Sequence, residues 1–215
     1  MSTLSESRSR LLVSEVGIPV SNWGTASSSE EAVSLAKNFG FPVVAKLCGD
    51  EIAHKTERGL VRLNLNTEEA VQKAADELLS IAIPEDGDVT LLISEQVQGN
   101  RELIVGLVRD EQFGPCVMLG IGGILAEAVA DVAFRLAPLS KAEASDLIND
   151  LSMQSLLGSF RGEPPLDREA LTNTLCALGE LAADKRILSV DLNPLIVSNG
   201  KPIAVDALIE IDEDA

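Results

Sequence analysis

The chain has 215 residues, of which 46% are hydrophobic and 24% are charged, and its formal net charge is −17. This composition is typical of a globular protein with one domain or two small lobes, and it excludes a disordered chain. The acidic excess argues against a nucleic-acid or anionic-membrane partner, because phosphate groups would be repelled. The single His excludes a multi-histidine zinc site, and the three separated Cys favour a reducing setting over a disulfide framework. Without an apolar signal core or a run of roughly 20 apolar residues, the chain is expected to be cytoplasmic.

Helices and strands alternate through the first half of the chain. Apolar residues at helical spacing predict helices over residues 4–16, 28–39 and 66–80. Ser28 stands three residues before Glu31, which is the spacing of a capping box, and Asn66 is expected to open the third helix. Short apolar or alternating runs predict strands over residues 42–47, 60–65 and 89–93.

The second half is richer in predicted strands. Strands are expected over residues 103–108, 116–121 and 132–136, and amphipathic helices over residues 140–151 and 167–183. Residues 187–197 and 202–209 predict a hairpin about Ser198-Asn199-Gly200, because Asn-Gly readily adopts the positive φ angles of a tight turn. The pattern indicates an α/β or α+β protein with a lobe boundary near residues 95–100.

Residues 46–62 carry four basic side chains against three acidic ones, in an otherwise strongly acidic chain. Lys46 ends an apolar strand, so its ammonium group is expected in a partly desolvated site, where a phosphate is a natural partner. The alternative is a lysine that extends from the strand end to solvent.

The only His lies in the same loop, in the run Ala53-His54-Lys55-Thr56-Glu57-Arg58-Gly59. A neutral imidazole is nucleophilic near pH 7, and neighbouring cations favour the neutral form. His54 is therefore a candidate acceptor of a phosphoryl group. The alternative is a surface histidine with no chemical role.

Three polar side chains near the C-terminus could form a metal site. Asp191 and Asn193 alternate onto one face of a strand, and a turn centred on Asn199-Gly200 brings Asp206 opposite Asn193. Two facing oxygen ligands suit Mg²⁺, which takes a few protein oxygens together with phosphates and water. The alternative is an edge hairpin with solvated acids.

These segments, in this order, resemble the ATP-grasp family, and more narrowly the ATP-grasp (beta) portion of ADP-forming acyl-CoA synthetases. The similarity runs from about residue 4 to residue 212, at HKTERGLV, RELIVGLVRDEQFGPCVMLGIGGILAE, DVAFRLAPL, GSFRGEPPLD, and SVDLNPLIV with AVDALIEID. It implies an ATP-grasp fold of two lobes, residues 16–96 and 97–215, that clamp a nucleotide, with a helix in residues 1–15 packed on the second lobe.

The resemblance also implies roles for individual residues. Lys46 would contact the phosphates of ATP or ADP, and His54 would be the phosphorylatable histidine. The segment Glu95, Gln96 and Val97 would hold adenine, through backbone groups of its last two residues.

Three further roles follow from the same resemblance. Glu102 would hydrogen-bond the ribose hydroxyls. Asn193 and Asp206 would hold Mg²⁺, with Asp191 beside them.

The reaction implied by the resemblance is acyl-CoA + ADP + phosphate ⇌ carboxylic acid + CoA + ATP. It requires a CoA-binding alpha subunit, with an α2β2 heterotetramer as the family expectation. The chain lacks the several hundred residues of that portion, so we expect it to be one subunit or a piece of a larger synthetase. Two alternatives stay open: a stand-alone carboxylate–amine ligase, and a nucleotide-binding module without turnover.

One position departs from the family pattern. The family has Gly-Gly-Val after the His-Lys motif, whereas this chain has Gly59-Leu60-Val61. A side chain at Leu60 is expected to alter the shape of the phosphate loop more than the fold.

Overall fold

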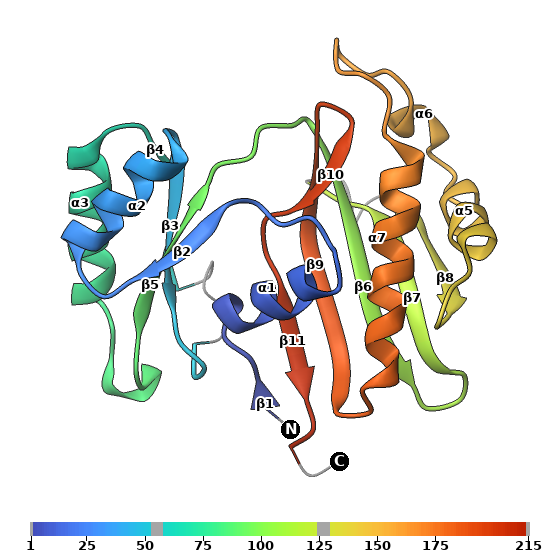
Figure 1. Cartoon of the computed structure of the whole chain (residues 1–215), viewed down its shortest axis with the longest axis horizontal. Helices are drawn as coiled ribbons and strands as arrows, with labels where there is room; N and C mark the ends of the chain where they lie inside the picture. The colour runs from blue at the N-terminus through green and yellow to red at the C-terminus, as the bar shows by residue number, and fades with distance from the viewer. Residues whose placement is uncertain (1, 53–57, 124–129, 214–215) are drawn as a thin grey trace. The chain divides into compact units, whose positions relative to one another are not determined.

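The computed structural model describes residues 2–52, 58–123 and 130–213 of the chain, which is drawn in Figure 1. Unit 1 consists of Met1–Leu4, Ser9–Val20 and Val97–Ala215, and unit 2 of Ser5–Arg8 and Ser21–Gln96. Helix α1 (Glu6–Glu15) is therefore divided, because its first turn belongs to unit 2 and its remainder to unit 1.

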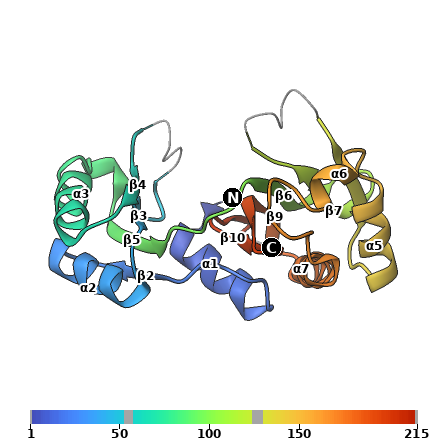
Figure 2. The ribbon, with the colours of Figure 1, turned by 90° about the horizontal axis from the view of Figure 1, so that it is seen from above.

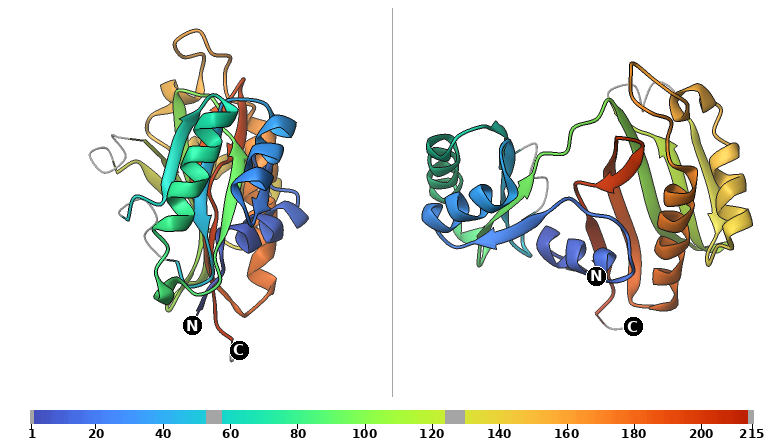
Figure 3. Two further views of the ribbon diagram at one scale, coloured as in Figure 1. Left: turned by 90° about the vertical axis from the view of Figure 1, so that its left-hand side faces the viewer. Right: turned by 45° about the horizontal axis from the view of Figure 1, so that its top comes forward.

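Unit 2 is a small antiparallel sheet with two helices on one face. Its described strands are β2 (Trp23–Ala26), β3 (Val43–Cys48), β4 (Val61–Leu65) and β5 (Thr90–Glu95), in the order β2-β5-β3-β4. Helices α2 (Ser29–Phe39) and α3 (Glu68–Ser80) lie side by side on the sheet (Figures 2 and 3), and the short 3-10 turn η1 (Pro84–Asp86) precedes β5. Every residue of β3 is buried, which makes this strand the centre of the unit 2 core.

The helix starts of unit 2 follow their capping residues. The Ser28 side chain accepts from the Glu31 N–H at 3.3 Å, so Ser28 caps α2 as predicted. The return bond of a capping box differs, because the Glu31 carboxylate accepts from the Ser27 N–H at 2.7 Å. The predicted opening of α3 is wrong: the Thr67 hydroxyl accepts from the Ala70 N–H at 3.2 Å, whereas Asn66 donates its side chain to the Asn64 C=O. Strand β2 was not predicted, because its four residues are too few to show alternation.

Unit 1 contains the larger sheet. Within the described residues it has seven strands in the order β1-β11-β9-β6-β7-β8, and β10 pairs with β9 beside this path. The strands are β1 (Ser2–Thr3), β6 (Arg101–Asp110), β7 (Gly114–Ile121), β8 (Val132–Leu136), β9 (Ile187–Ser198), β10 (Lys201–Ala204) and β11 (Leu208–Ile211). The helical elements are the unit 1 part of α1, α5 (Lys141–Asn149), α6 (Gln154–Leu157), α7 (Arg168–Glu180) and the 3-10 turn η2 (Leu181–Ala183).

The core of unit 1 lies between the sheet and its helices. Helices α5 and α7 cover one face of the sheet (Figures 1 and 2). Leu103, Val105 and Leu107 alternate along β6 toward this core, while Glu102 and Ile104 lie on the opposite face, as the two-residue period of a strand requires. The sheet thus has one buried face and one face that carries polar side chains.

The C-terminal hairpin has the predicted register. Pro202 pairs with Val197 and Ala204 with Leu195, and Asn199 and Gly200 have φ angles of 50° and 84°. The predicted second strand is interrupted, however, because the ladder resumes only with Leu208 opposite Asp191. The same register holds on both sides of the interruption, and Asp206 lies within it.

Within the described ranges, none of the helices is both long enough and apolar enough to span a bilayer.

Candidate functional site

The predicted site residues are distributed over both units. Lys46, Glu95 and Gln96 belong to unit 2, and Val97 opens the main segment of unit 1. Glu102, Asn193 and Asp206 also belong to unit 1. His54 lies outside the described residues, which stop at residue 52 and resume at Arg58.

Lys46 is buried in β3 and forms an ion pair inside unit 2. Its Nζ lies 2.7 Å from the Oε1 of Glu6, in the first turn of α1. The two side chains are only 8% and 1% exposed, so Lys46 does not extend freely into solvent. The ammonium group is therefore held at a fixed place in unit 2, and from there it could form a charge-assisted hydrogen bond to an anion.

The segment Glu95–Gln96 is tied to unit 2 through both its backbone and its side chains. The Glu95 N–H donates to the Asn22 C=O at 2.9 Å, and the Gln96 N–H donates to the Pro42 C=O at 3.1 Å. The Gln96 side-chain amide also makes two hydrogen bonds to Asn64, of 2.6 and 2.8 Å. These bonds fix the backbone of the segment and occupy its N–H groups.

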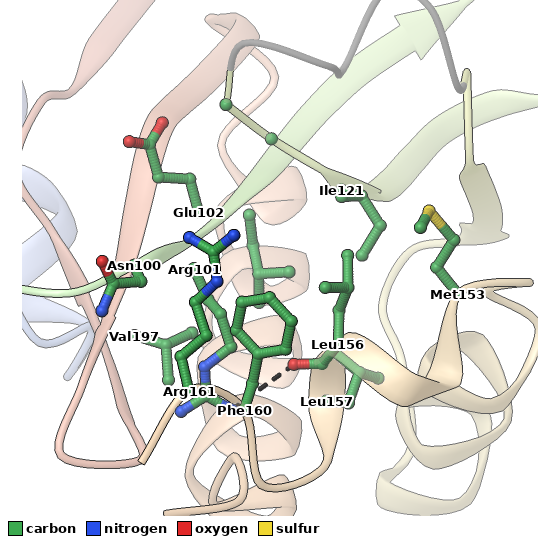
Figure 4. A pocket seen from close by; sticks show the side chains of 13 residues that line it. Asn100, Arg101, Glu102, Ile121, Met153, Leu156, Leu157, Phe160, Arg161 and Val197 are labelled. Carbon is green, nitrogen blue, oxygen red and sulfur yellow. Dashed lines mark hydrogen bonds between the residues drawn. The ribbon is translucent and has the colours of Figure 1, made fainter. Parts of the chain in front are cut away.

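Glu102 lies at the start of β6 beside a cavity of unit 1 that is shown in Figure 4. The Gly122 N–H donates to the Glu102 C=O at 2.8 Å, and a Cβ added to Gly123 would lie 3.7 Å from the Glu102 Oε2. Without side chains at these glycines, the end of β7 approaches the carboxylate closely. Figure 4 shows the Glu102 carboxylate pointing away from the ring of Phe160.

This cavity has a volume of about 450 Å³ and mostly apolar walls. It is lined by Asn100, Arg101, Glu102, Leu103, Ile121, Gly122, Gly123, Met153, Leu156, Leu157, Phe160, Arg161 and Val197. Arg101 is 4% exposed in its side chain and donates to the carbonyl groups of Gly158 and Pro164 at 2.9 and 2.6 Å. It thereby fixes the loop that forms one wall of the cavity.

The predicted metal residues lie on the face of the unit 1 sheet away from its helices. Asp191 and Asn193 line a second cavity, of about 370 Å³, together with residues of β6 and β7. The pairs Ala204–Leu195 and Leu208–Asp191 share one register, in which Asp206 would stand opposite Asn193. The Asp206 Oδ1 accepts from the Ala207 N–H at 2.9 Å.

Asp191 and Asp206 are close enough to interact electrostatically. Burial raises the pKa of the Asp191 carboxyl above its ordinary value, and the nearby charge of Asp206 raises it further. In the described part of the chain, no cluster of three His, Cys, Asp or Glu side chains could hold a metal ion. The donors here are two carboxylates and an amide oxygen, and a divalent cation would relieve their mutual repulsion, so their chemistry fits Mg²⁺.

Leu60, which departs from the family pattern, lies in the interior of unit 2, and residues 53–57 of the loop before it are outside the described residues. Its side chain is 1% exposed and belongs to the apolar core of unit 2. The Leu60 C=O accepts from the Leu47 N–H at 3.0 Å, which joins it to β3. The side chain at this position fills the core rather than a surface where a ligand would approach.

Two features near these residues were not predicted from the sequence. Glu6 pairs with Lys46 although 40 residues separate them, and the Arg58 guanidinium donates to both oxygens of Asp86 at 2.6 and 2.9 Å. Acidic residues are common in first helical turns because they interact favourably with the helix dipole, so nothing in the sequence distinguished Glu6 from an ordinary helix start.

A family model described as an ATP-grasp domain matches residues 1–211. The subunit beta of acetate–CoA ligase [ADP-forming] I from Pyrococcus furiosus is 36% identical over 95% of this chain and 90% of its own length. The acetate–CoA ligase [ADP-forming] I from Archaeoglobus fulgidus is also 36% identical over 92% of this chain, but the match spans only 29% of that protein. The chain thus corresponds to nearly all of the first relative and to less than a third of the second.

Solved structures agree with these relatives. The dinucleotide-forming acetyl-coenzyme A synthetase 1 of Ca. Korarchaeum cryptofilum, in complex with coenzyme A and Ca-AMPCP, has a TM-score of 0.90 at 38% identity, covering 98% of this chain and 94% of that one. A second structure of that protein holds Mg-AMPPCP, with its phosphohistidine segment pointing towards the nucleotide binding site, at a TM-score of 0.84 and coverages of 98% and 93%. The chain belongs to the ATP-grasp family and, within it, to the beta subunits of ADP-forming acetate–CoA ligases.

Proposed function

We propose that this chain is the nucleotide-binding subunit of an ADP-forming acyl-CoA synthetase, and that it transfers a phosphoryl group between His54 and ADP. The observation that carries the proposal is the match to a beta subunit of an ADP-forming ligase over 95% of this chain and 90% of that subunit. We also propose that units 2 and 1 correspond to the two lobes expected at residues 16–96 and 97–215.

In this proposal His54 relays the phosphoryl group between two remote sites. A phosphohistidine of the CoA-binding partner subunit, loaded from an acyl phosphate, would lose its phosphoryl group as its N–P bond breaks and a ring nitrogen of His54 forms a new N–P bond. That bond would then break as an oxygen of the ADP β-phosphate forms the new P–O bond. A relay of this kind replaces one long transfer by shorter in-line steps. The wider assembly, including an α2β2 stoichiometry, is part of the proposal.

Lys46 would bind the phosphates of the nucleotide. Its fixed ammonium group in β3 supports this role, because a preorganised cation stabilises the charge of a transferring phosphoryl group without reorganising during the reaction. Adenine would use the Gln96 C=O and the Val97 N–H, since the Gln96 N–H already donates to Pro42.

Glu102 would bind the ribose, and its place at the edge of the 450 Å³ cavity supports this role. Asn193 and Asp206 would hold Mg²⁺, with Asp191 beside them. The bound ion would neutralise phosphate charge in the transfer. Asp191 would keep the ligand set negative, which favours binding of a divalent cation.

The test is phosphorylation of the chain by [γ-³²P]ATP with Mg²⁺, alone and with its CoA-binding partner. We expect an acid-labile label that mass spectrometry locates on His54, and no label on a His54→Gln variant. An unlabelled chain that consumes ATP only with a carboxylic acid and an amine would instead identify a carboxylate–amine ligase. Nucleotide binding without label or turnover in any combination would leave only a binding module.

A further inference from the structure

The first turn of α1 is attached to the residues that surround Lys46. Glu6 Oε1 lies 2.7 Å from Lys46 Nζ, the Ser5 N–H donates to Asp50 Oδ1 at 2.9 Å, and Arg8 donates to Asp50 Oδ2 at 3.2 Å. Asp50 follows β3 by two residues, so the helical turn is bonded both to the strand and to the loop after it. All of these residues belong to unit 2.

A lysine side chain is ordinarily a poor positioning device. Its four-carbon stem is flexible, and holding it in one rotamer costs conformational entropy. A buried ammonium group also needs a counter-charge, because desolvation without a partner is strongly unfavourable. At Lys46 the carboxylate of Glu6 supplies a counter-charge and restrains the ammonium group, and the Glu6 side chain is itself only 1% exposed.

We propose that Glu6 is the positioning residue for Lys46: its carboxylate holds the ammonium group at the place from which it binds nucleotide phosphate. This inference rests on the proposed phosphate role of Lys46. An ammonium group has three N–H donors, so a bond to Glu6 is compatible with bonds to phosphate oxygens. Glu6 itself touches no substrate and acts only through Lys46.

The direct test is Glu6→Asp, which keeps the negative charge but shortens the side chain by one methylene. The dissociation constants of ADP and adenosine are measured by calorimetry on the full chain with Mg²⁺. Displacement of the ammonium group should weaken ADP binding by about tenfold or more, whereas adenosine, which has no phosphate, should bind within about twofold of the parent. A purely structural role would weaken both ligands together.

Two variants serve as controls. Glu15→Asp shortens an exposed acid of the same helix and should leave both dissociation constants unchanged. Asp86→Asn disrupts a different, partly buried ion pair of unit 2, so it should lower the melting temperature and change the dissociation constants of ADP and adenosine by the same factor.

The double variant Glu6→Gln with Lys46→Met removes both charges of the pair together, so neither is left buried without the other. It should lose ADP affinity and keep adenosine affinity. If it binds ADP like the parent, the phosphate role of Lys46 fails. Two outcomes would overturn the positioning role of Glu6 while the proposed function stands. In the first, the double variant loses ADP binding but the Glu6→Asp variant keeps it. In the second, Glu6→Asp weakens the binding of ADP and of adenosine equally.

Discussion

Arg58 donates two hydrogen bonds to Asp86, one to each carboxylate oxygen, at 2.6 and 2.9 Å. Asp86 also accepts from the Ile83 N–H at 3.0 Å and is 2% exposed. Its carboxylate therefore joins η1 to Arg58. A bidentate pair of this kind is directional as well as strong, and it fixes the chain at the end of the segment that contains His54.

This pair predicts a pH-dependent stability. The hydrogen bonds from Arg58, and after them the Ile83 N–H, hold the pKa of the Asp86 carboxyl below its ordinary value. The stabilisation is therefore complete above the ordinary Asp value and is lost as the pH falls through the lowered value. We expect Asp86→Asn to melt below the parent at pH 7 and the difference to shrink below about pH 4. A difference that stays constant from pH 7 to pH 3 would contradict this account.

The metal proposal predicts a loss that depends on the ion. Asp206→Asn removes one negative ligand. The factor by which Mg²⁺ increases ADP affinity should therefore be at least about tenfold smaller in the variant than in the parent. The measurement is ADP titration with Mg²⁺ and with EDTA. Asp146→Asn, an exposed acid of α5, is the matched control and should behave like the parent. An Asp206→Asn variant that retains the full Mg²⁺ effect would remove Asp206 from the site.

Leu60 is expected to matter for stability and not for the nucleotide. Leu60→Ala leaves a cavity in the core of unit 2 and should lower the free energy of unfolding by about 2–5 kcal/mol. Leu63→Ala, at a 59% exposed position of β4, should change it by less than about 0.5 kcal/mol. Urea denaturation gives both values. Weaker ADP binding by folded Leu60→Ala would show that this side chain shapes the phosphate loop after all.

Arg101 is expected to hold the loop over the Glu102 cavity. Arg101→Met removes the cation that pairs with Glu163 at 3.2 Å and leaves carbonyl groups of the loop without donors. Because the side chains are only 4% and 18% exposed, the free energy of unfolding should fall by about 3–5 kcal/mol.

Arg135→Met is the matched surface control for this change. Arg135 pairs with Asp150 where both side chains are more than a third exposed, so its loss should cost no more than about 1 kcal/mol. Equal losses at the two arginines would mean that burial does not set the strength of the Arg101 pair.

The parts of the fold that local chemistry determines were predictable from the sequence. The Asn199-Gly200 turn determined the register of β9 and β10, and Ser28 marked the start of α2. The interruption between β10 and β11 was not predictable, because residues 203–209 are apolar apart from Asp206 and contain no Gly or Pro that would mark a break.

The pairing of distant charges could not be predicted either. Nothing in the periodicity of the first helix indicates that Glu6 meets Lys46, since that contact depends on where the segment Ser5–Arg8 lies within unit 2. The burial of Leu60 was likewise hidden, because Gly59-Leu60-Val61 gives no sign of which face of the strand end is covered. The candidate site residues themselves could be predicted from the sequence. The side chains that contact them in the folded chain could not.

The division of α1 between the two units also bears on how the protein can be taken apart. A fragment cut at Ser21, where the main segment of unit 2 begins, would carry Lys46 but not Glu6. Its central strand would then lack the Glu6 carboxylate that pairs with the buried Lys46, and we expect such a fragment to be less stable although it contains every strand of its sheet. A fragment that keeps this ion pair therefore has to include Ser5–Arg8 together with Ser21–Gln96.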